Sequence, residues 1–103
     1  MAVLTLKEIN ATEKGDYRVA EVNKGTPDVG KVTMLPGARI PESGMATHVK
    51  EELCFIARGE IVFGTEHGEV TVKEGEFHRL DKAVPHFCRN DSGRDVHFVY
   101  IMI

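Results

Sequence analysis

Glycine and proline interrupt this chain at short intervals, which limits it to many short elements. Its 103 residues include 10 glycines and 4 prolines. Between them lie short runs rich in Val, Ile, Thr, Phe and Tyr, which favour strands, whereas Gly and Pro mark turns. Several strands at close spacing are typical of a sandwich or small barrel rather than of a βαβ sheet. The sequence therefore predicts an all-β fold.

The pattern also predicts where the strands lie. Residues 3–9 are expected to form a first strand or an arm, residues 10–15 a polar turn, and residues 24–30 and 40–45 loops. The other strands are expected, in chain order, at residues 17–22, 31–35, 52–57, 60–65, 69–72, 77–80, 86–89 and 96–103.

One segment also fits a helix. Val49, Leu53, Ile56 and Ala57 fall at i, i+4, i+7 and i+8, the spacing of an amphipathic helical face. A strand is favoured here, because the composition that follows is rich in β-formers and because Gly59 leaves room for only about a dozen residues.

Length and composition predict one domain over residues 1–103, with residues 1–16 as an N-terminal strand or arm and residues 17–103 as the barrel. With 42% apolar residues, the chain has enough apolar side chains for a single core. The net charge of −3, without a run of Lys or Arg, gives no electrostatic footprint for nucleic acid or an anionic membrane surface. Neither is expected as a partner.

The N-terminal residues lack the basic and apolar regions of a signal peptide, and no stretch approaches the ~20 apolar residues of a membrane span. A cytoplasmic protein is expected. Cys54 and Cys88 fit neither a disulfide framework nor a Cys-x-x-Cys motif, and in a reducing compartment we expect free thiols.

His48 and Glu52 have a spacing that metal sites use. On a straight strand they would lie about 13 Å apart, too far to share an ion. A turn over residues 49–51 would instead end one strand at His48 and begin the neighbouring strand, ~4.8 Å away, at Glu52. A helix would also serve, because i and i+4 share a face. By itself the spacing also fits an ordinary surface pair.

The region around this pair, residues 36–59, resembles the first motif of the cupin superfamily. That motif has a Gly, then His-x-His, three or four residues, a Glu, six residues and a Gly. His48 fits its second His, Glu52 follows after three residues, and Gly59 after six more. The position of the first His is Ala46, and three extra residues separate it from Gly37.

Residues 75–90 resemble the second cupin motif, which has a Gly, five residues, Pro-x-Gly, two residues, a His, three residues and an Asn. Gly75, His86 and Asn90 fit at the expected spacing, while Asp81 and Ala83 replace the Pro and the Gly. The two motifs cover about half of the chain. The resemblance implies a small antiparallel β-barrel of the jelly-roll type.

The resemblance also implies a metal site formed by His48, Glu52 and His86. Two imidazoles and one carboxylate are the set used by non-haem iron oxygenases, and are close to that of catalytic zinc sites. By resemblance the ion is a divalent transition metal: iron, manganese, nickel, zinc or copper. The alternative is a metal-free cavity in which the three residues form a polar hydrogen-bonded group.

Three further residues are expected near this site. Cys54 lies two residues after Glu52 and Cys88 two after His86, and by strand alternation each should point into the interior with its neighbour. Small apolar fillers are the favoured interpretation of both thiols, and a replacement ligand or an oxidisable thiol is the alternative. Tyr100 is expected to offer a hydroxyl to the cavity.

Other ionisable residues carry weaker expectations. His67 is expected in solvent, whereas His78 and His97 lie on expected strands whose facing the sequence does not fix. Four arginines are candidates for binding a carboxylate substrate: Arg39, Arg58, Arg79 and Arg89.

The apolar run over residues 96–103 predicts a strand buried on both faces, with its outer face covered by another subunit. We expect a homodimer, as small cupins commonly form.

The preferred functional hypothesis is a metal-dependent cupin enzyme acting on a small polar metabolite by oxygenase, isomerase, decarboxylase or lyase chemistry. The fold hosts many reactions and does not select one. The alternative is a non-catalytic module that binds or senses a small molecule or a metal. A purely structural barrel ranks last, since interior polar groups such as Glu52 and His86 are costly without a purpose.

Overall fold

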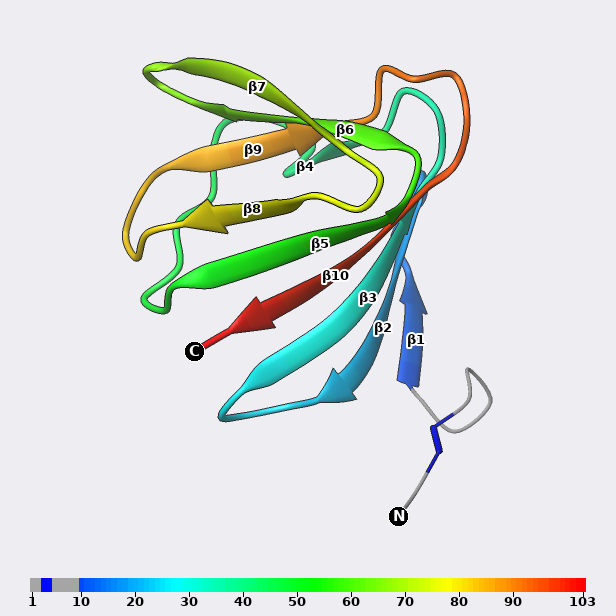
Figure 1. The fold of residues 1–103 in the computed structure, drawn as a ribbon, viewed down its shortest axis with the longest axis vertical. Coiled ribbons are helices and arrows are strands. Elements are labelled where there is room, and N and C mark those ends of the chain that lie inside the picture. The colour runs from blue at the N-terminus through cyan, green and yellow to red at the C-terminus, as the bar shows by residue number, and fades with distance from the viewer. Residues whose placement is uncertain (1–2, 5–9) are drawn as a thin grey trace.

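The computed structural model describes residues 3–4 and 10–103, and within them ten strands form two antiparallel sheets (Figure 1). The larger sheet has the order β1 (Asn10–Glu13), β2 (Tyr17–Asn23), β3 (Asp28–Met34), β10 (Val96–Met102), β5 (Glu52–Arg58) and β8 (Phe77–Leu80). The smaller sheet has the order β4 (Arg39–Ile40), β9 (His86–Arg89), β6 (Glu60–Thr65) and β7 (Gly68–Lys73). Figure 1 shows the second sheet stacked over part of the first.

The all-β prediction is confirmed. The rival helix over residues 49–57 is wrong, because the chain bends at Val49 and Lys50 and continues as strand β5. The strand is more stable than a helix in this segment, because β5 forms backbone hydrogen bonds with β10 on one side and with β8 on the other. The described residues contain no helix long and apolar enough to cross a membrane.

Two expected connections are partly strand. Residues 10–13 were predicted to be turn, but they form β1 along the edge of β2, with Asn10 opposite Glu21 and Glu13 opposite Arg18. Polar residues can form such an edge strand because β2 supplies its hydrogen-bond partners. The loop predicted over residues 24–30 is shorter, since β3 begins at Asp28. The strand or arm predicted over residues 3–9 lies mostly outside the described residues.

The C-terminal strand β10 lies in the middle of the larger sheet, between β3 and β5. Its inward residues Val96 and Phe98 are buried, at 0% and 4% exposure, but residues 99–102 are only half-buried. Within the single chain the outer face of β10 is therefore only half-covered, and its burial by another subunit stays a prediction. Central sheet position satisfies the backbone of β10 without covering its outer face.

The core fills the space between the sheets with aliphatic and aromatic side chains. Met34, Ile56, Ile61 and Val96 are almost completely buried there. Their alternation with exposed neighbours follows the period of two that places successive side chains on opposite faces.

Asn90, from the second motif, has a structural role. Its side chain is fully buried, and its Nδ2 donates to the carbonyls of Met34 at 3.0 Å and Arg94 at 2.6 Å. Its Oδ1 accepts from the backbone and hydroxyl of Ser92. A fully paired amide of this kind fixes the connection from β9 to β10 without leaving a buried polar atom unsatisfied.

Candidate metal centre

A cavity of about 250 Å³ lies between the two sheets. Residues of β2, β3, β5 and β10 line it from the larger sheet, and residues of β4, β6 and β9 from the smaller. Most of the lining is apolar, including Val32, Phe63 and Phe98. Tyr100 can lie in this wall because it stands opposite Gly30 on β3, where a Cβ would come within 2.3 Å of the tyrosine oxygen.

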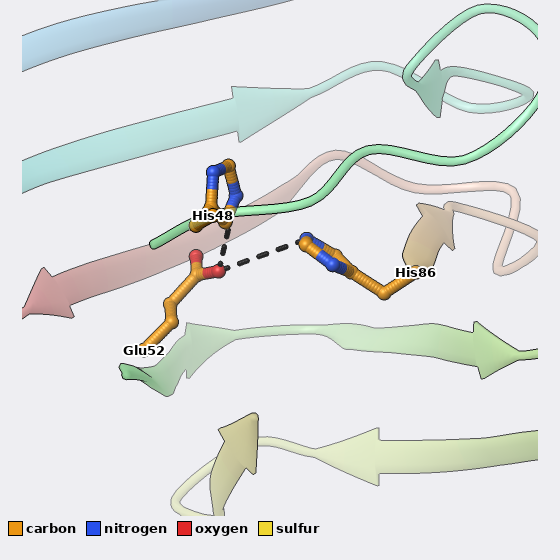
Figure 2. A group of neighbouring side chains, drawn as sticks. All are labelled: His48, Glu52 and His86. Atoms are coloured by element: carbon orange, nitrogen blue, oxygen red, sulfur yellow. Dashed lines mark ion pairs between the residues drawn. The ribbon is translucent and has the colours of Figure 1, made fainter. Parts of the chain in front are cut away.

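His48, Glu52 and His86 meet at the wall of this cavity (Figure 2). One carboxylate oxygen, Glu52 Oε2, lies 3.5 Å from Nε2 of His48 and 3.8 Å from Nε2 of His86. The two imidazole centroids are 4.8 Å apart. Glu52 and His86 are mostly buried, with side chains 14% and 12% exposed, while His48 at 35% stands nearer to solvent.

The route of the chain explains this convergence. Ala46 is bridged to His86 by two backbone hydrogen bonds, and the carbonyl of His48 accepts from the N–H of Ala83 at 2.7 Å. The segment that carries His48 therefore lies beside the beginning of β9, in the smaller sheet. Glu52 begins β5 in the larger sheet. The expectation that these two residues occupy neighbouring strands is wrong: the bend at residues 49–50 crosses from one sheet to the other.

His86 is held in one tautomer by its backbone surroundings. Its Nδ1 lies 2.9 Å from the carbonyl of Val84, which can only accept, so Nδ1 carries the proton. The lone pair of Nε2 is then free and directed toward Glu52. Metal-bound histidines are commonly oriented by this kind of second hydrogen bond.

The carboxylate of Glu52 is also oriented. The thiol of Cys54 donates to Oε1 at 3.4 Å, which leaves Oε2 as the oxygen that faces both imidazoles. The three residues thus present two nitrogens and one oxygen at the same point.

This donor set fits a transition metal. Two atoms each about 2.1 Å from one tetrahedral ion lie about 3.4 Å apart, close to the 3.5 and 3.8 Å that separate Glu52 Oε2 from the imidazole nitrogens. The three ligand atoms all lie within 4.8 Å of one another. The methyl group of Ala46 lines the same cavity and offers no ligand atom, so such an ion would keep positions open for a further ligand.

The two cysteines have different places. Cys88 lines the cavity, whereas Cys54 is packed in the core, 2% exposed, and is not among the lining residues. Burial, followed by the nearby Glu52 charge, raises the pKa of Cys54 strongly and that of Cys88 to about 12. Both thiols are therefore protonated at neutral pH, a state in which sulfur is a poor ligand and a poor nucleophile.

The other histidines lie outside the cluster. His78 faces inward and stacks on Phe63 with ring centroids 4.2 Å apart, and burial lowers its pKa. His97 Nδ1 lies 3.1 Å from the hydroxyl of Thr33. His67 is 85% exposed, as the sequence predicts.

None of the four candidate arginines lines the cavity. Arg89 pairs with Glu69 and Asp91, Arg79 lies near Glu51 and Asp81, and the Arg39 guanidinium covers the ring of Phe87. Of the lysines and arginines that the structure describes, Lys14 lines the cavity; the sequence did not predict this residue or Tyr17 as part of the site. No motif marks these two residues; β1 and β2 bring them to the cavity by pairing.

Comparison with known proteins identifies the domain. The Cupin domain family matches residues 30–102. No curated protein matches the chain in sequence.

Solved structures share the fold at low identity. A Thermotoga maritima protein described as a predicted oxalate decarboxylase is 22% identical, with 99% of this chain and 98% of that chain covered and a TM-score of 0.85. The Cupin_2 domain of an XRE family transcriptional regulator from Enterobacter cloacae is 22% identical, with coverage of 84% and 95% and a TM-score of 0.74. A sugar phosphate isomerase from Silicibacter pomeroyi is 14% identical, with coverage of 98% and 74% and a TM-score of 0.79.

Proposed function

This chain belongs to the cupin family, and from that premise we propose that it binds a divalent transition metal and acts as a metal-dependent enzyme on a small molecule in its cavity. One observation carries the proposal: His48, Glu52 and His86 present ligand atoms within 4.8 Å of one another at the wall of a cavity of about 250 Å³. In a chance surface cluster, the side chains would be neither mostly buried nor held in place by hydrogen bonds to neighbouring groups.

Two imidazoles and one carboxylate would hold the ion, which by its chemistry is iron, manganese, nickel, zinc or copper. When bound, it supplies a Lewis acid that polarises a substrate oxygen. Glu52 and His86 fix the position of the site, since each is oriented by a hydrogen bond to a second group. The largely apolar lining of the cavity would shield part of a bound substrate from water. Tyr100, whose pKa is raised chiefly by burial, stays a neutral hydrogen-bond donor at its wall.

The reaction belongs to the oxygenase, isomerase, decarboxylase or lyase types. The printed descriptions of the structural neighbours, a predicted oxalate decarboxylase and a sugar phosphate isomerase among them, span this range and do not choose within it.

A second candidate is a non-catalytic module that binds a small molecule or senses a metal. Ala46 favours it, because this residue stands in the cavity where the family's first motif has a histidine. The likeness to the cupin domain of a transcriptional regulator is consistent with it.

Metal analysis of untagged protein tests the primary proposal. We expect about one equivalent of a transition metal in the wild type and its loss in His48→Ala and His86→Ala. His67→Ala is the matched control, because His67 is solvent-exposed and far from the cluster in sequence. Metal-free wild-type protein that also fails to bind added Zn²⁺, Mn²⁺ or Fe²⁺ would refute the proposal.

We further propose that residues 1–103 form one domain whose two sheets close into a jelly-roll barrel, that the protein is a cytoplasmic homodimer, and that nucleic acid and membranes are not its partners. The half-buried outer residues of β10, Val99 and Ile101, support a second subunit on this face. Sedimentation equilibrium that gives the mass of a single chain would contradict the dimer.

A further inference from the structure

The charges around the cavity narrow the class of molecule it can bind. Among the described residues, its ionisable lining consists of Glu52, His48 and His86 at the proposed metal, together with Lys14, Tyr17, Cys88 and Tyr100. A divalent ion held by one carboxylate and two neutral imidazoles carries a net charge of +1, because +2 and −1 are added. This charge balances one negative charge on a ligand and leaves a second one uncompensated.

Arginine does not supply the missing charge. Arg89 is paired with Glu69 and Asp91, and within residues 10–103 no arginine lines the cavity. Lys14 lines it, but this side chain is exposed and also lines a neighbouring polar pocket, in which Asp16 and Glu42 balance the charges of Lys14 and Arg39. Lys14 therefore lies at the rim of the cavity, in contact with water and near carboxylates. A charge in such a place contributes little to the binding of an anion inside the cavity.

The rest of the wall is apolar. Val19, Val32, Phe63, Phe98 and Met102 line the cavity together with Tyr100. A second carboxylate or a phosphate placed against these side chains would lose its water without gaining a hydrogen-bonded cation, which is strongly unfavourable. An aliphatic or aromatic group placed there would be stabilised by removal from water.

The size of the cavity limits the part of a ligand that it can enclose. About 250 Å³ equals the liquid volume of roughly eight water molecules. The space therefore accommodates a compact molecule with one short branched chain or a single ring beyond its polar head.

We propose that the cavity binds a small monoanion with an oxygen-donor head and an apolar body, of the class of 2-oxo or 2-hydroxy monocarboxylates with a branched or aromatic side chain. The head lies at His48, Glu52 and His86, and the body lies against the apolar wall. This inference rests on the proposed function, because it assumes an ion at those three residues.

A matched ligand series tests the inference with the purified chain loaded with Co²⁺. Isothermal titration compares pyruvate, 4-methyl-2-oxopentanoate and oxalate. The first two share one head and one charge and differ by three carbons, whereas oxalate adds a second charge. Since each buried methylene strengthens binding roughly fourfold, 4-methyl-2-oxopentanoate should bind at least tenfold more tightly than pyruvate. It should also bind at least tenfold more tightly than oxalate.

A charge variant sharpens the test. Val19→Lys places a cation in the cavity wall, where Val19 is half-buried, and should raise the affinity for oxalate while it lowers that for 4-methyl-2-oxopentanoate. Val22→Lys is the control, because Val22 lies on the same strand, 38% exposed, and does not line the cavity. The wild-type series decides the matter even if Val19→Lys does not fold.

The outcomes separate the two proposals. Failure to bind Co²⁺ would overturn the proposed function and this inference with it. Co²⁺ binding combined with a preference for oxalate, or with equal affinity for the two 2-oxo acids, would overturn this inference alone.

Discussion

Ala46 and His86 are joined by two backbone hydrogen bonds, in which the N–H of each residue donates to the carbonyl of the other at 2.9 Å. Residues paired in this way project their side chains to the same face, with Cβ atoms about 5 Å apart. The methyl group of Ala46 accordingly lines the same cavity as His86. The family position that lacks its histidine is thus still directed at the candidate metal centre.

Ala46→His should restore a fourth ligand. A side chain at this position starts beside His86, so a histidine there could reach the same ion. We expect the affinity for Zn²⁺ to rise by about tenfold or more, the size of effect that residues around a metal site commonly have on its affinity. Competition with a chromophoric chelator measures it. Thr47→His is the control, since Thr47 does not line the cavity. Unchanged affinity in Ala46→His would show that the ion, if bound, lies elsewhere.

Ala83→Gly should stabilise the protein. Ala83 has a positive φ of 64°, the left-handed region, where an L-residue other than glycine is strained by roughly 1–2 kcal/mol. Glycine removes this strain but gains entropy in the unfolded chain, so we expect a net gain of about 0.5–1 kcal/mol and a melting temperature higher by a few degrees. Urea unfolding measures the free energy.

The control for this change is Ala57→Gly on the exposed side of strand β5. The same substitution there should destabilise by about 0.5–1 kcal/mol, because the strand backbone has no positive φ to relieve. If Ala83→Gly destabilises the protein by as much as Ala57→Gly, the strain at residue 83 is not real.

Gly30→Ala should displace the ring of Tyr100. A Cβ on Gly30 would lie 2.3 Å from the tyrosine oxygen and 2.4 Å from its Cζ, so the ring must move. Overpacking of this kind costs about 1–3 kcal/mol. A double-mutant cycle with Tyr100→Ala tests the cause, because Gly30→Ala should cost little once the ring is absent. Equal costs in both backgrounds would contradict the steric explanation.

Both cysteines should be inert in the native protein. Burial raises the pKa of Cys88 to about 12 and that of Cys54 higher still, so almost no thiolate is present at pH 8. Reaction with DTNB should be on the order of 100-fold slower, or more, than in urea-unfolded protein, where both thiols should titrate. Rapid native reaction of one thiol would instead support the redox role that the sequence left open.

The loop that joins His48 to Glu52 should loosen at low pH. Lys50 Nζ lies 3.1 Å from a carboxylate oxygen of Asp28, whose other oxygen accepts from the N–H of Gly25. The hydrogen bond from Gly25, then that from Lys50, lowers the pKa of Asp28 below its usual 3.8.

The sign of the effect follows from proton linkage. A carboxyl group with a lowered native pKa stabilises the fold fully above its unfolded pKa, and this stabilisation is lost as the pH falls through the native pKa. The difference in unfolding free energy between wild type and Asp28→Asn should therefore be constant from pH 7 to about 5 and should shrink below about pH 4. Urea titrations across that range measure it, and a difference that widens in acid would contradict the pairing.

Much of the fold was readable from the sequence because strands and turns leave local signals. Gly and Pro marked most turns, β-branched and aromatic runs marked most strands, and the paired motif spacings identified the cupin family. The strand over residues 10–13 could not be predicted, because an edge strand made of polar residues has the same local sequence pattern as a turn. Only its pairing with β2 makes it a strand.

The sequence by itself determined which residues are the candidate ligands, because the resemblance of two stretches to the cupin motifs singled out His48, Glu52 and His86. Tertiary structure decided how they meet, because backbone pairing of Ala46 with His86 holds His48 beside β9 of the smaller sheet, while Glu52 begins β5 of the larger sheet. It also decided the character of the cavity, in whose wall the described part of the chain places Lys14 at the rim and no arginine. Spacing along a chain encodes local geometry, whereas the facing of side chains from distant strands depends on a register that only the assembled sheets define.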